Sequence, residues 1–197
     1  MNRGKLIVLS APSGSGKTTI AKAIMQKYPA MLFSVSATTR VMRSGEMDGK
    51  DYFFLTREQF ELRIASNDLV EWEKYPDDVH GNYYGTLKSE VDRALNRGRV
   101  MLFDVDVKGA LSIKKRYARD AVLIFIKPPS FQALKDRLLN RKTEDQATIR
   151  RRLERAEMEL EKGKEFDYQV VNDDLPKAIA EVDTIIKEHT QMETLQH

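Results

Sequence analysis

The chain has 197 residues, of which 41% are hydrophobic and 32% charged, and its formal net charge is +3. This length and composition fit one globular domain with a buried core, and so small an excess of charge gives no reason to expect nucleic-acid binding. Cysteine is absent, which excludes disulfides, thiolate metal sites and a cysteine nucleophile. No apolar run is long enough for a signal peptide or a membrane span, so we expect a soluble cytoplasmic protein without a membrane partner.

Apolar segments alternate with helical patterns along most of the chain. Three short segments are largely apolar and contain β-branched residues, namely 5–10, 100–105 and 121–126. Helical patterns follow them at about 17–28, 108–117 and 130–141. A further strand and a last helix are expected at 167–171 and 175–189. Because strands covered on both faces are apolar throughout, this alternation predicts an α/β fold with a parallel sheet and crossover helices.

Two regions depart from the alternation. Residues 50–85 have the pattern of a small mixed insertion with its own strands, and Thr56 with Gln59 forms a capping box that predicts a short helix between them. Residues 143–165 have helical propensity but carry charges nearly all round. A helix with so little apolar face is predicted to be exposed and movable.

The segment 6–19, LIVLSAPSGSGKTT, matches the phosphate-loop pattern G-x-x-x-x-G-K-[ST] except at Ala11. It follows a predicted strand and opens a predicted helix, as the motif requires. Gly14 and Gly16 let backbone N–H groups surround a polyphosphate, Lys17 can reach the β- and γ-phosphates, and the Thr18 hydroxyl can face Mg²⁺. The predicted ATP-binding loop comprises Ala11, Pro12, Ser13, Gly14, Ser15, Gly16, Lys17 and Thr18. The alternative is a plain Gly/Ser turn, which the Lys-Thr pair and the flanking elements disfavour.

The segment 34–46, SVSATTRVMRSGE, contains a second set of anion-binding residue types. Arg40 and Arg43 lie three residues apart among several hydroxyl side chains. Because an arginine fork binds two phosphate oxygens at once, the pair suggests an anion clamp. Tyr52 and the pair Tyr83–Tyr84 could add phenolic donors. Taken alone, the segment is better explained as a solvated basic loop.

Nine motifs from the phosphate loop to the last helix resemble those of the guanylate kinase family. They are SAPSGSGKTT, FSVSATTRVMRSGE, GKDYFF, VEWEKY, GNYYGT, LFDVDVKGA, IFIKPPS, LKDRLLNR and VVNDDL. Their order and spacing make the resemblance specific over nearly the whole chain. Two positions depart from the usual pattern: Met42 stands where a proline is frequent, and Ala11 where glycine is usual.

The resemblance implies an α/β P-loop fold in a single domain spanning 1–197. Its parts are a parallel-sheet core (about 1–33, 87–140 and 166–197), a small mixed α/β GMP-binding lobe (about 34–86) and a helical lid (about 141–165). The implied ligands of the GMP phosphate are Arg40, Arg43, Tyr52 and Tyr84, and the implied readers of guanine are Ser36, Glu71 and Thr86. Guanine presents N1–H and N2–H₂ donors beside the O6 acceptor, so a carboxylate with hydroxyls complements it. Without the resemblance, Glu71 reads as a surface carboxylate on a strand.

The resemblance also implies how the phosphoryl group is transferred. Positioning and charge neutralisation supply most of the rate of such a reaction. The implied catalytic residues are Lys17, Arg40, Asp104, Arg141 and Arg152. Arg137 and Asn172 are implied on the ATP side, although Asn172 also reads as a turn residue. For Arg150, Arg151 and Arg155 we predict a solvated, salt-bridged helix face.

Two aspartates follow the apolar run at 100–103. Asp104 stands where a Walker-B carboxylate occurs in this class of fold, and Asp106 is assigned to the GMP-binding set as a partner of the acceptor base. Both could instead cap the following helix, and for Asp106 the two readings stay open. His80, His189 and His197 have no metal-ligand spacing and receive no role.

The sequence therefore predicts ATP-dependent, Mg²⁺-assisted phosphorylation of GMP, and of dGMP, in purine nucleotide metabolism. The main rival is a guanylate-kinase-like module that binds phosphopeptides, which would tend to lose the phosphate loop and lid arginines present here. A kinase for another nucleoside monophosphate is a second rival, and Glu71 with Ser36 and Thr86 argues against AMP. The oligomeric state stays open, with a homodimer as one option.

Overall fold

A computed structural model describes residues 3–74, 81–139 and 146–192. Its core is a five-stranded sheet with the order β2-β7-β1-β8-β9, in which every neighbouring pair is parallel. The strands are β1 (Lys5–Ser10), β2 (Leu32–Phe33), β7 (Val100–Asp104), β8 (Ala121–Lys127) and β9 (Tyr168–Val171). The predicted α/β fold with a parallel sheet is confirmed.

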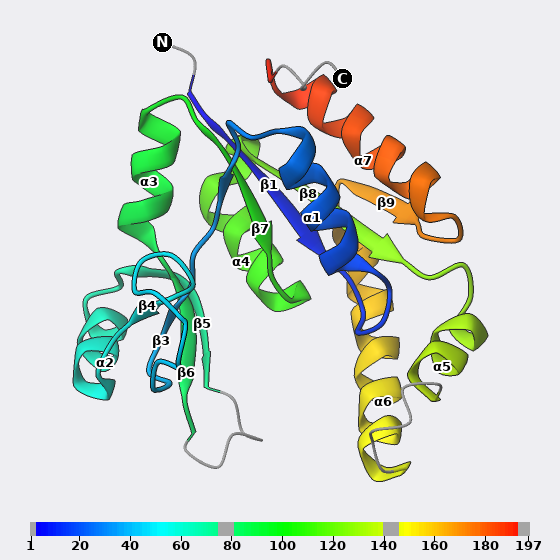
Figure 1. Cartoon of the computed structure of the whole chain (residues 1–197), viewed down its shortest axis with the longest axis horizontal. Helices are drawn as coiled ribbons and strands as arrows, with labels where there is room; N and C mark the ends of the chain where they lie inside the picture. The colour runs from blue at the N-terminus through cyan, green and yellow to red at the C-terminus, as the bar shows by residue number, and fades with distance from the viewer. Residues whose placement is uncertain (1–2, 75–80, 140–145, 193–197) are drawn as a thin grey trace.

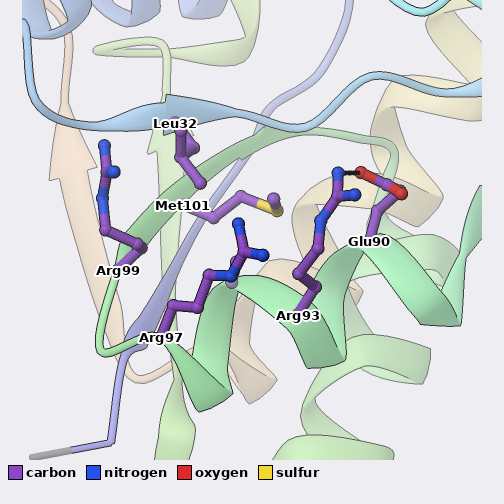
Figure 2. Close-up of a pocket in the computed structure, with 7 residues that line it drawn as sticks. Leu32, Glu90, Arg93, Arg97, Arg99 and Met101 are labelled. Carbon is purple, nitrogen blue, oxygen red and sulfur yellow. Dashed lines mark hydrogen bonds and ion pairs between the residues drawn. The ribbon is translucent and has the colours of Figure 1, made fainter.

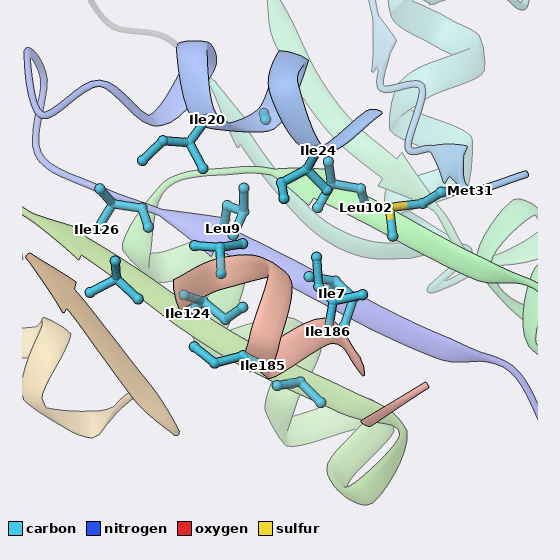
Figure 3. Close-up of a cluster of buried hydrophobic side chains, with 14 of the residues drawn as sticks. Ile7, Leu9, Ile20, Ile24, Met31, Leu102, Ile124, Ile126, Ile185 and Ile186 are labelled. Atoms are coloured by element: carbon cyan, nitrogen blue, oxygen red, sulfur yellow. The ribbon is translucent and has the colours of Figure 1, made fainter. Parts of the chain in front are cut away.

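Helices cover both faces of this sheet (Figure 1). They are α1 (Lys17–Lys27), α3 (Lys88–Asn96), α4 (Val107–Tyr117) and α7 (Leu175–His189), with a short 3₁₀ turn at Ala118–Asp120. Successive side chains of a strand point to opposite faces, so Ile7 and Leu9 of β1 pack with α1 and α7, whereas Leu6 and Val8 pack with α3 and α4. Figure 3 shows the first of these two cores, where side chains from α1 and α7 meet the sheet.

A second, four-stranded sheet has the order β4-β3-β6-β5 and is mixed, because β3 pairs parallel with β4 and antiparallel with β6. The strands are β3 (Ala37–Thr38), β4 (Phe53–Phe54), β5 (Leu69–Lys74) and β6 (Tyr83–Leu87). Helix α2 (Arg57–Ala65) packs on this sheet through the buried Phe60 and begins with the predicted capping box of Thr56 and Gln59. The mixed insertion is therefore present, and its strands begin earlier than residue 50.

Two further helices, α5 (Phe131–Leu139) and α6 (Gln146–Lys162), follow β8, and a 3₁₀ turn at Gly163–Glu165 leads into β9. The four-stranded sheet lies to one side of the core, and α5 and α6 lie to the other (Figure 1). A methyl group at Gly163 would overlap the ring of Phe125, so only glycine allows this close approach of the turn to β8. None of the helices in the described ranges combines the length and low charge that a bilayer span needs.

The carboxyl ends of β1 and β7 lie side by side, with Leu9 paired to Asp104. The loop after β1 therefore begins beside the last residues of β7. In open parallel sheets, ligands bind outside the carboxyl ends of the strands. This edge is where the functional site is expected.

A buried carboxylate ties α7 to α1 on the opposite side of the molecule from α4. Asp183 is 5% exposed and accepts hydrogen bonds from the Tyr28 hydroxyl (2.6 Å) and Lys27 Nζ (2.8 Å), with Lys187 Nζ at 2.9 Å. Burial works to raise the pKa of Asp183, but the hydrogen bonds from these three groups outweigh it and hold the pKa below its ordinary value. The ionised form is therefore the one that stabilises the fold.

We expect Asp183→Ala to lower the free energy of unfolding at pH 7 by about 3 kcal/mol, because the buried Tyr28 hydroxyl loses its acceptor. The depressed pKa means that the contribution of Asp183 is fully present above its unfolded pKa of about 4 and is lost as the pH falls through the folded value. Urea unfolding measures the difference between wild type and variant, which should narrow below about pH 4. The control is Glu181→Ala, at an exposed position of α7. An equal loss in both variants would contradict the prediction.

Candidate functional site

The loop between β1 and α1 curls around the N-terminus of α1. Gly14 and Gly16 have positive φ angles of 91° and 88°, a conformation that side chains other than glycine rarely adopt. Helix α1 begins at Lys17 without a side-chain hydrogen bond to its first turn, so the first N–H groups can face an anion. The loop lines a cavity of about 980 Å³ together with residues of α6 and with Asp106. The local geometry is that of a phosphate-binding loop.

Asn172 supports this loop through a hydrogen bond from its side chain. Its side chain is 7% exposed, and its amide nitrogen donates to the Ser15 carbonyl at 2.8 Å. A methyl group at Gly16 would overlap the same amide nitrogen. Asn172 follows β9 and is itself fixed by a backbone hydrogen bond to Lys127, at 2.9 Å, while its own carbonyl accepts from Arg137 at 3.2 Å. Asn172 thus supports the loop structurally, and its implied role on the ATP side stays a prediction.

Lys17 is held at the carboxyl end of β7. Its Nζ lies 2.5 Å from Asp104 Oδ1 and donates to the Val105 carbonyl at 2.8 Å. The exposed Thr18 borders the cavity next to it. The loop lysine therefore meets the strand-end carboxylate, and the loop hydroxyl lies beside the same lysine on the cavity.

Three neighbouring strands of the second sheet bring together the predicted guanine readers. Ala37 of β3 pairs with Gly85 of β6, and this antiparallel register places Ser36 beside Thr86. On the other side of β6, the register of β5 shifts between Leu69 and Trp72, and Glu71 lies within this irregular stretch. The Thr86 hydroxyl donates to Glu71 Oε1 at 2.7 Å. Trp72 points to the other face, where it packs edge-on against Tyr83 and stays about half exposed.

The environment of Glu71 changes its acidity. Burial raises the pKa of the Glu71 carboxyl, the hydrogen bond from Thr86 partly offsets this, and the nearby Asp106 and Glu73 carboxylates add to the rise. This half-buried carboxylate already accepts one hydrogen bond, from Thr86, and the rest of its desolvation cost falls when a further donor reaches it.

The residues predicted to bind the GMP phosphate also cluster. The Arg40 guanidinium lies 5.2 Å from the ring centroid of Tyr52 and 5.7 Å from that of Phe54. Tyr84 packs edge-on against Tyr52, with ring centroids 6.1 Å apart. Aromatic rings under a guanidinium fix its plane, so the fork of Arg40 has a defined orientation.

Glu46 joins this cluster, although the sequence analysis assigned it no role. Both of its oxygens accept from the Arg40 fork, at 2.7 and 3.0 Å, and one also accepts from the Arg43 backbone N–H at 2.7 Å. Hydrogen bonds from Arg40 and the Arg43 backbone hold the pKa of Glu46 below its ordinary value. The Arg43 side chain is exposed. The sequence feature that could have pointed to Glu46 is its place three residues after Arg43, the second arginine of the clamp.

Helix α6 reaches both halves of the site. Arg152 donates from Nη1 to Ser13 Oγ of the phosphate loop at 3.3 Å. Arg155 pairs with Asp106 Oδ2 at 3.2 Å and with Glu159 Oε1 at 2.9 Å. The predicted exposed, salt-bridged helix face is present at Arg150, which pairs with Glu154, and at Arg155, which pairs with Glu159. The additional pairing of Arg155 with Asp106, on another element, was not predicted.

Asp106 caps helix α4, which was one of its two predicted roles, and it also lines the cavity of the site. Its Oδ1 accepts from the Gly109 N–H at 2.8 Å and so caps α4, while Oδ2 faces Arg155. Glu159 is the other acidic residue here that the sequence analysis did not name; burial raises its pKa, and Arg155 partly offsets the rise. Arg141 lies outside the described residues.

A smaller cavity of about 180 Å³ lies away from this edge of the sheet, between β2 and α3 (Figure 2). Arg93, Arg97 and Arg99 surround it, and Arg99 donates to the Ala30 carbonyl at 2.7 Å. These cations stand at and after the C-terminus of α3, where they complement the helix dipole. The pocket contains none of the loop or acceptor residues described above.

Known proteins resemble the chain along most of its length. A guanylate kinase family model matches residues 3–189. A guanylate kinase of Chlorobaculum tepidum is 50% identical over 188 residues, covering 95% of this chain and 94% of that protein, and one of Salinibacter ruber is 48% identical, covering 93% and 95%. The crystal structure of guanylate kinase from Anaplasma phagocytophilum matches with a TM-score of 0.71 at 29% identity, over 96% of this chain and 88% of that one.

Gly16 and Gly45 form a matched pair for testing the support that Asn172 gives to the loop. Both have φ of 88°, but a methyl group would meet Asn172 at Gly16 and nothing within 4 Å at Gly45. Each alanine substitution should cost about 1–2 kcal/mol of stability for the backbone conformation. Only Gly16→Ala should also weaken ATP binding, by roughly tenfold or more, since the loop must move away from the amide. Calorimetric ATP titration of both variants measures this; equal ATP affinities would contradict it.

Proposed function

The chain belongs to the guanylate kinase family, whose members are phosphotransferases that phosphorylate GMP with ATP, and we propose that the site described above carries out this transfer. The proposal extends to dGMP, because the groups assigned to the acceptor address its base and phosphate rather than its ribose. The diphosphate products would enter purine nucleotide metabolism.

One observation carries the assignment of the acceptor: Glu71 and Thr86 face each other on β5 and β6, 2.7 Å apart, with Ser36 in the same row. The Glu71 carboxylate accepts from guanine N1–H and N2–H₂, and a hydroxyl donates to O6. Adenine has an acceptor at N1 and a donor at N6, so it would leave these groups mispaired. A site built on substrate hydrogen bonds can reject the wrong base by about 10⁴-fold.

The transfer needs two phosphates held in line. The loop N–H groups and Lys17 hold the donor, and Arg40, with Tyr52 and Tyr84, holds the phosphate of the acceptor. Lys17 exchanges its contact with Asp104 for the β- and γ-phosphates when ATP enters. Arg152, already at the phosphate loop, neutralises charge on the group in transit, a contribution worth about 10³–10⁵ in rate for such arginines.

The oxygen atoms beside the phosphate loop are suitable ligands for Mg²⁺. This ion takes oxygen ligands, keeps several waters and binds mainly through one or two protein oxygens and the substrate phosphates. The exposed Thr18 hydroxyl and the half-buried Asp104 carboxylate provide such oxygens beside the loop. When bound with ATP, Mg²⁺ would neutralise charge on the phosphates, and Thr18 and Asp104 would hold it directly or through water.

A coupled assay that offers GMP, dGMP, AMP, UMP and CMP in parallel tests the acceptor. We expect turnover of GMP and dGMP, with AMP at least about 10³-fold poorer in kcat/KM, because of the donor and acceptor pattern at Glu71 and Thr86. Lys17→Ala should abolish transfer and still bind GMP. Comparable turnover of AMP, or none of GMP, would reject the proposal.

The raised pKa of Glu71 predicts a pH dependence of GMP binding. Only the ionised carboxylate accepts both guanine donors, so GMP affinity should fall as the pH drops through a value above the ordinary pKa of about 4.3 for a glutamic acid. Glu71→Gln, which does not titrate, should bind GMP roughly 100-fold more weakly near neutral pH and lose this dependence. ATP affinity, measured on the same variant, serves as the internal control. A pH profile unchanged by the substitution would contradict the assignment.

A further inference from the structure

Helix α6 places two arginines on one face, and they touch different halves of the site. Arg152 and Arg155 are three residues apart, a spacing that puts side chains on the same face of a helix. Arg152 contacts Ser13 of the phosphate loop, and Arg155 contacts Asp106 at the start of α4. Both arginines line the cavity of about 980 Å³ that the phosphate loop also lines.

Asp106 is within reach of the acceptor side. A methyl group built on Gly109 would lie 3.3 Å from Asp106 Oδ1 and 3.5 Å from Glu71 Cδ, so both carboxylates border the first turn of α4. The two oxygens of Asp106 have separate partners: Oδ1 caps α4 through the Gly109 N–H, and Oδ2 faces the Arg155 guanidinium. These contacts to its two carboxylate oxygens therefore fix the rotamer of Asp106.

Arg155 also balances charge at this point. Its guanidinium lies between Asp106 and Glu159, and Glu159 is only 7% exposed. Asp106 and Glu159 line the cavity, and Glu71 lies near them beside the first turn of α4, so three carboxylates gather at this point. Removing the cation would leave these carboxylates to repel one another and would free Asp106 Oδ2 to turn away.

We propose that Arg155, on helix α6, is a positioning residue for the acceptor nucleotide. It acts by fixing Asp106 beside Glu71. The inference rests on the proposed function, since it takes Glu71 to be the reader of guanine. A carboxylate oxygen can accept more than one hydrogen bond, so Asp106 Oδ2 can keep Arg155 and also accept a guanine N–H. Because Arg152 is on the same helix, the contact links the phosphate loop to the acceptor site through one rigid element.

Equilibrium binding tests this role without relying on turnover. Arg155→Gln should weaken GMP binding about fivefold, a coupling of ordinary size, and should change ATP binding by less than about twofold. Arg155→Lys keeps the positive charge and should recover part of the GMP affinity. The matched control is Arg150→Gln, which removes an exposed arginine of the same helix whose partner is Glu154 and should change neither affinity.

A double-mutant cycle separates positioning from a general structural effect. If Arg155 acts through Asp106, then Arg155→Gln in an Asp106→Asn background should weaken GMP binding no further. Additive losses, an unchanged GMP affinity or an equal loss of ATP affinity would overturn the inference. Tighter GMP binding would also overturn it, because it would mean that Arg155 competes with the base. Since the readout is GMP affinity, a chain that binds GMP without phosphorylating it would reject the proposed function and still test this role.

Discussion

The parallel pairing of β1 with β7 is the constraint on which the site depends. It places the loop after β1 beside Asp104, the last residue of β7. Lys17, the first residue of α1, can therefore contact both Asp104 and the Val105 carbonyl. Buried apolar side chains on both faces of β1 hold this register. A strand shifted by one residue would turn Ile7 and Leu9 to the wrong face, so the hydrophobic core and the geometry of the site are specified together.

Much of the fold could be predicted from the sequence because its signals are local. Uniformly apolar strands, the capping box at Thr56 and the spacing of the phosphate loop each depend on residues close together in the chain. The assignment of Glu71 needed the family resemblance, because a carboxylate on a short strand looks the same whether it faces solvent or Thr86. Only the pairing of β5 with β6 decides between these positions.

The residues that sequence reasoning missed or misread are those whose partners are distant in the chain. Arg155 meets Asp106 across 49 residues, and Asn172 meets Ser15 across 157. A charged helix such as α6 shows i, i+4 pairs in its sequence, and Arg150 with Glu154 fits that pattern. Which of its arginines also meets a residue of another element depends on how the helix packs against the rest of the chain, and no local pattern records this.

The charged side chains of the site differ in how far the folded chain already compensates their charge. Three cations of the site have a carboxylate partner: Lys17 has Asp104, Arg40 has Glu46 and Arg155 has Asp106. In the proposed function, a phosphate that enters the clamp or the loop would replace the carboxylate at Arg40 or Lys17, so that much of the desolvation of the cation would already have occurred during folding. Glu71 is the opposite case, since burial disfavours its charge until a base arrives. In the proposed function, the part of this penalty that Thr86 does not offset would be relieved by a base with two donors, so the folding cost at Glu71 would itself favour guanine.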